Sequence, residues 1–332
     1  MATIKEVAEL AGVSIATVSR MINQNGYVSK QAEQSIASAM EQLGYKPLAA
    51  RRMAVNSMPT IALILPDITN LFFSELARAI EDVSQQKGYA VFFCNSDHQD
   101  HREIRYLDIL RKRKIDGIIF ASNYLTQQEL DRLRQQQIPV VVLDRASDTS
   151  KCTLIRSNNY EGAIMAVRHL LDTGCQKIAH IYGPPEIATA SERMQGYEDS
   201  VRSCSWYTPS LMAPGMFRLE GGVQAVETLL NRHPDIDGIF AGNDLMALGA
   251  LKALHRKGIS VPEKIAVCGF DGISLAEIVE PELTTVAQPI YEMGKVAAQS
   301  VIQQIEEGRT GTHPDVIEME VKLKVRGSTR RG

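Results

Sequence analysis

Several short apolar runs of this 332-residue chain are followed by polar side chains of the kinds that hold sugar hydroxyls. Carboxylates, carboxamides and guanidinium groups form paired hydrogen bonds with neighbouring hydroxyls, and aromatic rings cover the apolar face of a sugar. The polar residues are Asp67, Asn70, Ser122, Asn123, Asp144, Arg145, Asn243, Asp244 and Asp271, with Phe72 and Phe73 following Asn70. Their combination predicts a binding site for a small sugar.

Each of these residues also has a purely structural interpretation. Asn70 could cap a helix, Phe72 and Phe73 could belong to the core, and Asp144 with Arg145 could be a solvated ion pair. No single position decides between the two interpretations. Their joint placement after the apolar runs is what favours a binding site.

An enzyme would need a reactive arrangement that the sequence does not provide. Asp144 and Asp271 could serve as paired carboxylates for glycoside chemistry, but Arg145 beside Asp144 would keep that carboxyl ionised instead of raising its pKa. The seven histidines form no HxxxH or HExxH pair, and neither GxSxG nor GxxxxGK[ST] occurs. We therefore expect no catalytic residue, no metal ion and no cofactor.

The apolar runs alternate with amphipathic segments of helix length, which is typical of parallel sheets covered on both faces. The segment 115–123, "IDGIIFASN", is echoed by 236–244, "IDGIFAGND", so the sequence predicts two similar α/β lobes, each with a doubly wound parallel sheet. In such sheets ligands bind at the carboxyl ends of the strands, where the polar residues lie. The runs cover residues 61–65, 90–94, 117–121, 140–143, 177–182, 238–242 and 264–270.

A separate all-α module is predicted at the N-terminus. Thr3 and Glu6 form a capping box, apolar residues then recur at helical spacing, and Gly12 ends the run. Ser14 and Ser29 can each begin a further helix. Helix, short turn, helix is the helix-turn-helix arrangement, whose second helix enters the major groove of DNA.

The second of these helices carries residue types that read base edges. If Val18, Met21 and Ile22 form its buried face, three residues at its start point outward: Ile15, Ala16 and Arg20. Small apolar groups meet thymine methyls, and an arginine can donate two hydrogen bonds to guanine. Thr3, Ser14, Thr17 and Ser19 suit phosphate contacts. The alternative is a small helical bundle packed on another part of the protein, with Ile15 buried there.

Charge and composition are compatible with this organisation. Residues 1–58 hold six Lys/Arg and four Glu, whereas the whole chain has a net charge of -3. No apolar stretch is long enough to span a membrane, no signal peptide precedes the first helix, and the five cysteines have no CxxC spacing. These features predict a cytoplasmic protein with reduced thiols and argue against a periplasmic transport receptor.

The segment "TIKEVAELAGVSIATVSRMIN" resembles the N-terminal domain of the lactose/galactose repressor family. The resemblance implies a DNA-binding domain at 1–45, acting in a homodimer on a palindromic double-stranded operator. It also implies a hinge at 46–58 that folds into a short helix on DNA. Met53 stands where the family usually has the leucine that wedges into the minor groove, and this hinge is one residue shorter than usual.

The remainder, 59–327, resembles the periplasmic sugar-binding fold that this family shares. The implied lobe 1 covers 59–158 and 290–325, and lobe 2 covers 159–288. The ribose-binding members have a residue pattern that matches Asn70, Phe72, Phe73, Asp144, Arg145, Arg193, Phe217, Asn243, Phe270, Asp271 and Gln288; Ser122 replaces their asparagine.

The resemblance therefore implies a repressor of a sugar-catabolic operon, with D-ribose as the expected inducer. Another sugar or sugar phosphate, such as fructose or sucrose, and a global carbon regulator with a protein co-repressor are the alternatives. Induction versus co-repression, dimer versus tetramer, and the operator sequence stay open at this point.

Overall fold

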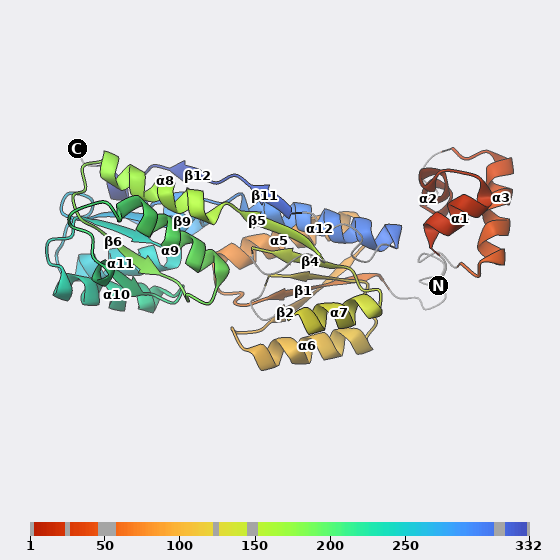
Figure 1. Ribbon diagram of the computed structural model, residues 1–332, viewed down its shortest axis with the longest axis horizontal. Coiled ribbons are helices and arrows are strands. Elements are labelled where there is room, and N and C mark those ends of the chain that lie inside the picture. Colours follow the sequence, from red (N-terminus) through yellow and green to blue (C-terminus); the bar gives the residue numbers. More distant parts are fainter. Residues whose placement is uncertain are drawn as a thin grey trace.

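The structure is a computed structural model that describes residues 3–23, 27–45, 58–121, 126–144, 152–308 and 316–330. It contains a three-helix module and a core of two α/β lobes, each with a six-stranded sheet (Figure 1). The predicted fold class is confirmed. Among the described residues, no helix is long and apolar enough to cross a membrane.

The N-terminal module is made of α1 (Ile4–Ala11), α2 (Ile15–Asn23) and α3 (Lys30–Gln42). The predicted capping box is present, because Glu6 N donates to Thr3 Oγ1 at 3.3 Å and Thr3 N donates to Glu6 Oε2 at 2.7 Å. Gly12, at φ +66°, ends α1 in the left-handed region that favours glycine. The module has its own small core, formed by Ile4, Val7, Ala8, Val18, Ile36 and Ala39.

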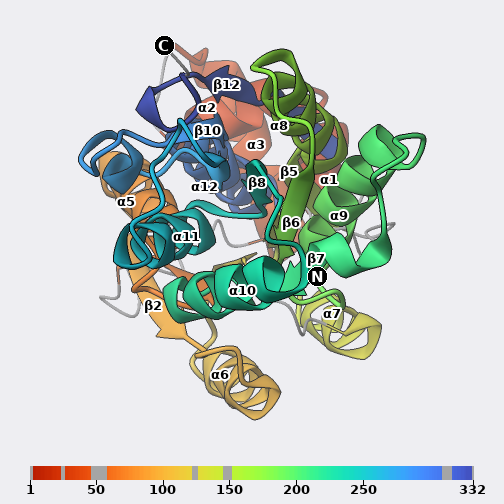
Figure 2. The ribbon, with the colours of Figure 1, turned by 90° about the vertical axis from the view of Figure 1, so that its left-hand side faces the viewer.

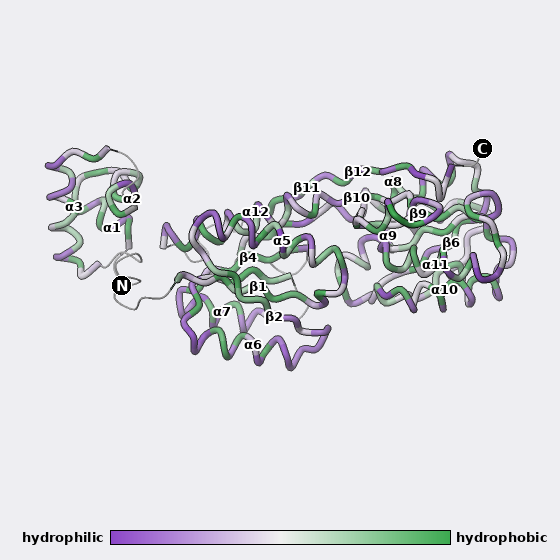
Figure 3. Tube along the Cα trace, turned by 180° about the vertical axis from the view of Figure 1, so that it is seen from behind, coloured by the Kyte–Doolittle hydropathy of each residue, from purple (hydrophilic) through white to green (hydrophobic). Residues whose placement is uncertain are grey.

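Lobe 1 is built on a sheet with strand order β11-β5-β4-β3-β1-β2, and every pairing in it is parallel. Its strands are β1 (Thr60–Leu65), β2 (Ala90–Asn95), β3 (Gly117–Phe120), β4 (Val140–Leu143), β5 (Thr153–Ser157) and β11 (Val316–Met319). Helices α5 (Leu71–Gln86) and α12 (Ile290–Glu307) cover one face, and α6 (Asp100–Lys112) and α7 (Gln127–Gln135) cover the other (Figure 1). The central strands β1, β3 and β4 are apolar because both of their faces are covered, as Figure 3 shows by hydropathy.

Lobe 2 repeats this architecture with strand order β12-β10-β9-β8-β6-β7. Its strands are β6 (Ile178–Tyr182), β7 (Met212–Pro214), β8 (Gly238–Ala241), β9 (Ala266–Asp271), β10 (Thr284–Ala287) and β12 (Lys322–Lys324). Helices α8 (Asn159–Asp172) and α9 (Ala188–Val201) lie on one side, and α10 (Leu219–Arg232) and α11 (Asp244–Arg256) on the other (Figure 2). Short 3-10 turns complete the lobe at Pro209–Leu211, Ser274–Glu277 and Gly327–Thr329.

The chain passes between the sheets after β5, after β10 and between β11 and β12. The last crossing corrects the expected lobe division, which assigned the whole segment 290–325 to lobe 1. The strand β12 pairs antiparallel with β10, with Val286 opposite Leu323, so it belongs to lobe 2. A three-residue edge strand with two exposed lysines gives too short a pattern to be assigned to a sheet from sequence.

Candidate functional site

A cavity lies between the two lobes, at the carboxyl ends of strands from both sheets. The space between its walls, including the open solvent at its mouth, is about 640 Å³. Lobe 1 lines it with Pro66, Asp67, Asn70, Phe72, Phe73, His98, Ala121 and Asp144. Lobe 2 lines it with Ile187, Thr189, Arg193, Phe217, Arg218, Asn243 and Asp271. The strand-end residues predicted from sequence are thus brought together wherever the structure describes them, except Asp244.

The lobe 1 wall combines a helix cap with two aromatic rings. Asn70 is the N-cap of α5, and its Oδ1 accepts a hydrogen bond from Phe72 N at 3.1 Å. The capping hydrogen bond uses Oδ1, whereas the amide nitrogen can donate to a ligand. Asn70 can therefore cap α5 and bind a ligand at the same time. The rings of Phe72 and Phe73 meet edge to face, with centroids 5.0 Å apart.

Asp144 reaches the cavity from the end of β4. Its backbone has φ +53°, and its N–H donates to Ile155 O at 2.8 Å, which fixes the turn that directs this side chain. Three other predicted residues, Ser122, Asn123 and Arg145, lie outside the described residues.

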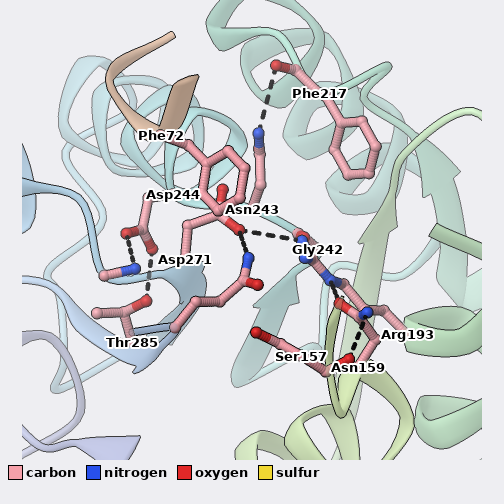
Figure 4. A network of polar contacts seen from close by, with 12 residues as sticks. Phe72, Ser157, Asn159, Arg193, Phe217, Gly242, Asn243, Asp244, Asp271 and Thr285 are labelled. Atoms are coloured by element: carbon pink, nitrogen blue, oxygen red, sulfur yellow. Dashed lines mark hydrogen bonds and ion pairs between the residues drawn. The ribbon is translucent and has the colours of Figure 1, made fainter. Parts of the chain in front are cut away.

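The lobe 2 wall is a polar network around Arg193 and Asp271 (Figure 4). Arg193 is only 3% exposed, and its Nη1 donates to Gly242 O at 2.6 Å and to Asp271 Oδ1 at 3.3 Å. Its Nε donates to Asn159 Oδ1 at 2.9 Å. The guanidinium lies 3.7 Å from the centroid of the Phe270 ring. These contacts therefore hold the Arg193 guanidinium in one orientation.

Asp271 is the acceptor in this network, and Gln288 is a second donor to it. Gln288 Nε2 donates to Asp271 Oδ1 at 2.8 Å. Burial raises the pKa of Asp271, the charge of Arg193 and the bond from Gln288 lower it, and the charge of Asp144 raises it. Both protein bonds end on Oδ1, which leaves Oδ2 to accept from a bound hydroxyl. Gln288 Oε1 is buried and has no hydrogen-bond partner among the described residues.

Phe217 and Asn243 complete the wall of lobe 2. Asn243 caps α11 by accepting from Met246 N at 2.9 Å, and its Nδ2 donates to Phe217 O at 3.4 Å. Phe217 has φ +55° and its ring lies against Gly183, where an added Cβ would collide with the ring. A glycine at 183 is therefore needed to seat this aromatic ring.

Phe270 and Gln288 do not line the cavity themselves. Phe270 is fully buried and lies beneath the Arg193 guanidinium, and Gln288 lies behind Asp271. Their role in the structure is to hold Arg193 and Asp271 in place.

Asp244 also follows a strand, but it points away from the cavity. Its Oδ2 accepts from Gly272 N at 2.7 Å and Ile273 N at 2.9 Å, and its Oδ1 accepts from Thr285 Oγ1 at 2.6 Å. Burial raises the pKa of Asp244, and the neighbouring Asp271 charge adds to that rise. Asp244 thus fastens the turn after Asp271 to α11 and β10.

Two substitutions of Asp244 distinguish the contribution of its hydrogen bonds to stability from that of its charge. In Asp244→Asn the amide oxygen can accept from Gly272 and Ile273 while its nitrogen donates to Thr285, so we expect unfolding free energy within about 1 kcal/mol of wild type. Asp244→Ala leaves buried donors unpaired and should cost about 2–4 kcal/mol. Urea unfolding of the three proteins measures this; an equal loss in both variants would contradict the assignment.

Sequence reasoning missed His98, Thr189 and Arg218 in the cavity wall. His98 follows β2 as Asp144 follows β4, so the strand-end rule applied to every strand would have found it. Burial lowers the pKa of His98, the charges of Asp67 and Asp97 oppose that shift, and the charge of Arg218 adds to it. The neutral imidazole can both donate and accept.

The helix-turn-helix module presents part of its predicted DNA-contact surface. Ala16 and Arg20 are exposed on α2, as expected. Ile15 is half-buried and packs against the module core, because it lies three residues before Val18 on the same helix face. The prediction of a fully outward Ile15 is thereby corrected.

The polar residues of this surface also have structural partners. Thr17 N donates to Ser14 Oγ at 3.1 Å, and the hydroxyls of these two residues are 2.8 Å apart. Thr3 is engaged in its capping box, and Ser19 is half-buried. Met53 lies outside the described residues.

A cleft between two lobes that is lined by residue types suited to sugars, together with a helix-turn-helix module, defines a ligand-responsive DNA-binding regulator. Residues 3–47 match the family described as bacterial regulatory proteins of the lacI family, and residues 58–326 match the periplasmic binding proteins and sugar binding domain of the LacI family. The chain belongs to the LacI family and is a transcriptional repressor of that family.

Known relatives support this membership over the whole chain. The sequence is 41% identical to the ribose operon repressor of Halalkalibacterium halodurans over 333 residues, which cover 100% of this chain and 98% of that protein. It is 33% identical to the transcriptional repressor PurR of Histophilus somni, over 99% of each chain. A LacI family regulator from Enterococcus faecium, solved with bound ribose, has a TM-score of 0.73 and 32% identity, covering 81% of this chain and 98% of that one.

Proposed function

We propose that this repressor controls a sugar-catabolic operon and that D-ribose is its inducer. The observation that carries the proposal is the network of Arg193, Asp271 and Gln288 in the cleft, with aromatic rings from both lobes beside it. As a regulator of chromosomal DNA it would act in the bacterial cytoplasm, on a palindromic operator.

The charges of the cavity favour a neutral polyol. Three carboxylates, Asp67, Asp144 and Asp271, contribute acceptors, and Arg193 and Arg218 contribute donors. Ring hydroxyls of a pentose both donate and accept, so they match this mixture. Among the described lining residues carboxylates outnumber guanidinium groups by three to two, so a sugar phosphate would add negative charge to a wall that already has an excess of it. The similarity of the ribose operon repressor and of the ribose-bound structure points the same way.

The relatives of the chain support binding without catalysis, because they are transcriptional repressors. Asp271 receives hydrogen bonds from Arg193 and Gln288, which lower its pKa against the larger rise that burial causes. We propose that Asp144 and Asp271 act as hydroxyl acceptors and that the protein has no catalytic residue, no metal ion and no cofactor.

Isothermal titration calorimetry with D-ribose, ribose 5-phosphate, fructose, sucrose and a purine base tests the effector assignment. We expect micromolar binding of D-ribose alone. Binding of a purine base would instead follow the similarity to PurR, and binding of another sugar would keep the regulator while removing ribose as its effector.

A homodimer is part of the proposal, and the edge of lobe 1 offers a surface for it. The strand β2 is an edge strand, and on it Phe92 and Phe93 are 40% and 45% exposed. Large exposed aromatic side chains on an unpaired edge are typical of an interface. A second copy of the chain placed there would cover both rings.

Phe93→Glu should therefore weaken the dimer at least about 10-fold, because it would bury a carboxylate in an apolar interface. Sedimentation equilibrium measures the dissociation constant. The control is Val325→Glu, which adds the same charge at an exposed position near the end of lobe 2. Equal dissociation constants for wild type and both variants would show that β2 is not part of the dimer interface.

A further inference from the structure

An ion pair joins the two lobes beside their crossing strands. Arg156 lies on β5 of lobe 1, and its Nη1 donates to Oε1 of Glu192 on α9 of lobe 2 at 2.9 Å. The other side of the guanidinium is held within lobe 1, because Nη2 and Nε donate to Glu318 Oε2 on β11 at 2.8 and 3.2 Å. Arg156 is thus fixed to lobe 1 by one carboxylate and reaches lobe 2 through the other.

Helix α9 connects this ion pair to the cavity. Glu192 directly precedes Arg193, and successive helix residues point about 100° apart. One side chain therefore faces β5 while the next faces Asp271. Any rotation of α9 relative to lobe 1 changes the Arg156–Glu192 distance and moves Arg193 in the same motion.

The surroundings of the pair permit such a rotation. A solvent-accessible groove beside it is lined by Asn158 at the crossing and by Tyr160, Ser191 and Gln195 of lobe 2, so the ion pair lies beside open space instead of within close apolar packing. Arg156 and Glu192 are each 27% exposed. A pair at this depth is strong enough to bias a two-state equilibrium and weak enough to break.

We propose that the Arg156–Glu192 ion pair is an interlobe latch that stabilises the lobe arrangement seen here, in which residues of both lobes line one cavity. The inference rests on the proposed allosteric function. If sugar favours this arrangement and operator favours another, the latch adds to sugar affinity and subtracts from operator affinity. By linkage, its loss must shift the two affinities in opposite directions.

A merely structural ion pair would act differently. Its loss would lower the free energy of unfolding and leave the ratio of sugar affinity to operator affinity unchanged. Opposite shifts in the two affinities are therefore the signature of a latch.

The test compares the full-length wild type with Glu192→Gln. The control, Asp199→Asn, removes a 3.3 Å ion pair with Arg202, the residue that follows the same helix. The new amide keeps an oxygen that can accept from Tyr160 and Gln195, the other partners of Asp199, and all of these contacts lie within lobe 2. D-ribose affinity is measured by calorimetry, and operator affinity by anisotropy on a duplex selected in vitro with the wild-type protein. In Glu192→Gln we expect about 2- to 5-fold weaker ribose binding and 2- to 5-fold tighter operator binding, with both values unchanged in Asp199→Asn.

Small-angle X-ray scattering of the ligand-free proteins gives a readout that does not depend on the effector. The latch predicts a larger radius of gyration for Glu192→Gln than for wild type or Asp199→Asn. If wild type fails to bind ribose but this difference is present, the latch stands and the effector assignment falls. Equal radii, or affinities that are unchanged or shift together, would overturn the latch.

Discussion

Asp271→Asn is expected to weaken D-ribose binding by about 30- to 1000-fold. Asp271 is buried and charged, and it accepts from Arg193 and Gln288 while presenting its second oxygen to the cavity. Removing one partner of a buried charged hydrogen-bond network typically costs about 2–4 kcal/mol of binding. The new side chain also has an NH₂ group in place of one carboxylate oxygen. That group would face either the hydroxyls of the ligand or the two protein donors, Arg193 and Gln288. Calorimetry with D-ribose measures the loss.

The same substitution has an expected signature in stability against pH. Because the pKa of Asp271 is raised in the folded protein, the folded state holds its proton at pH values where the unfolded state has already lost it. The contribution of Asp271 to stability is therefore largest below its ordinary pKa of about 4 and declines as pH rises through the raised folded value. Asp271→Asn should lack that decline. Parallel pH profiles of unfolding free energy in the two proteins would contradict this account of Asp271, as would ribose affinity within about 3-fold of wild type.

Arg20→Ala is expected to weaken operator binding by about 30-fold or more. Arg20 is exposed on α2, where its guanidinium can donate two hydrogen bonds to a guanine. Each contact in which an arginine donates two hydrogen bonds to a guanine contributes about 1–3 kcal/mol. A dimer bound to a palindromic operator would lose two such contacts. Fluorescence anisotropy with the selected operator measures the change.

Arg20→Lys is the matched variant because it keeps the positive charge and loses the two-pronged donor. It should lose discrimination between operator and random DNA while keeping nearly the same salt dependence. Operator affinity within about 2-fold of wild type in both variants would show that another residue reads the bases.

The sequence patterns predicted the central strands well, because a strand covered on both faces must be apolar at every position. The runs at β1, β3, β4 and β8 are examples, and each is buried along nearly its whole length. Short or outer strands such as β7, β11 and β12 expose part of their residues, so they leave no comparable pattern. Their position in a sheet depends on the path of the chain between the lobes.

The structure brings most of the predicted site residues that it describes to one cavity, but their individual contacts were not predicted. Strand ends located Asn70, Asp144 and Asp271, since parallel strands bring such positions together. Which residues support others could not be deduced in this way. That Phe270 lies under Arg193, and that Asp244 turns back to bind Thr285, depends on contacts between elements far apart in the sequence.

The proposed coupling between sugar binding in the cleft and operator binding is tested most directly by titrating D-ribose into the operator complex. Anisotropy should show the operator dissociation constant rising about 5- to 150-fold as D-ribose saturates the protein, with no change from ribose 5-phosphate. A dissociation constant that stays the same at saturating D-ribose would contradict the claim that this sugar controls DNA binding. One that falls would make D-ribose a co-repressor and contradict induction.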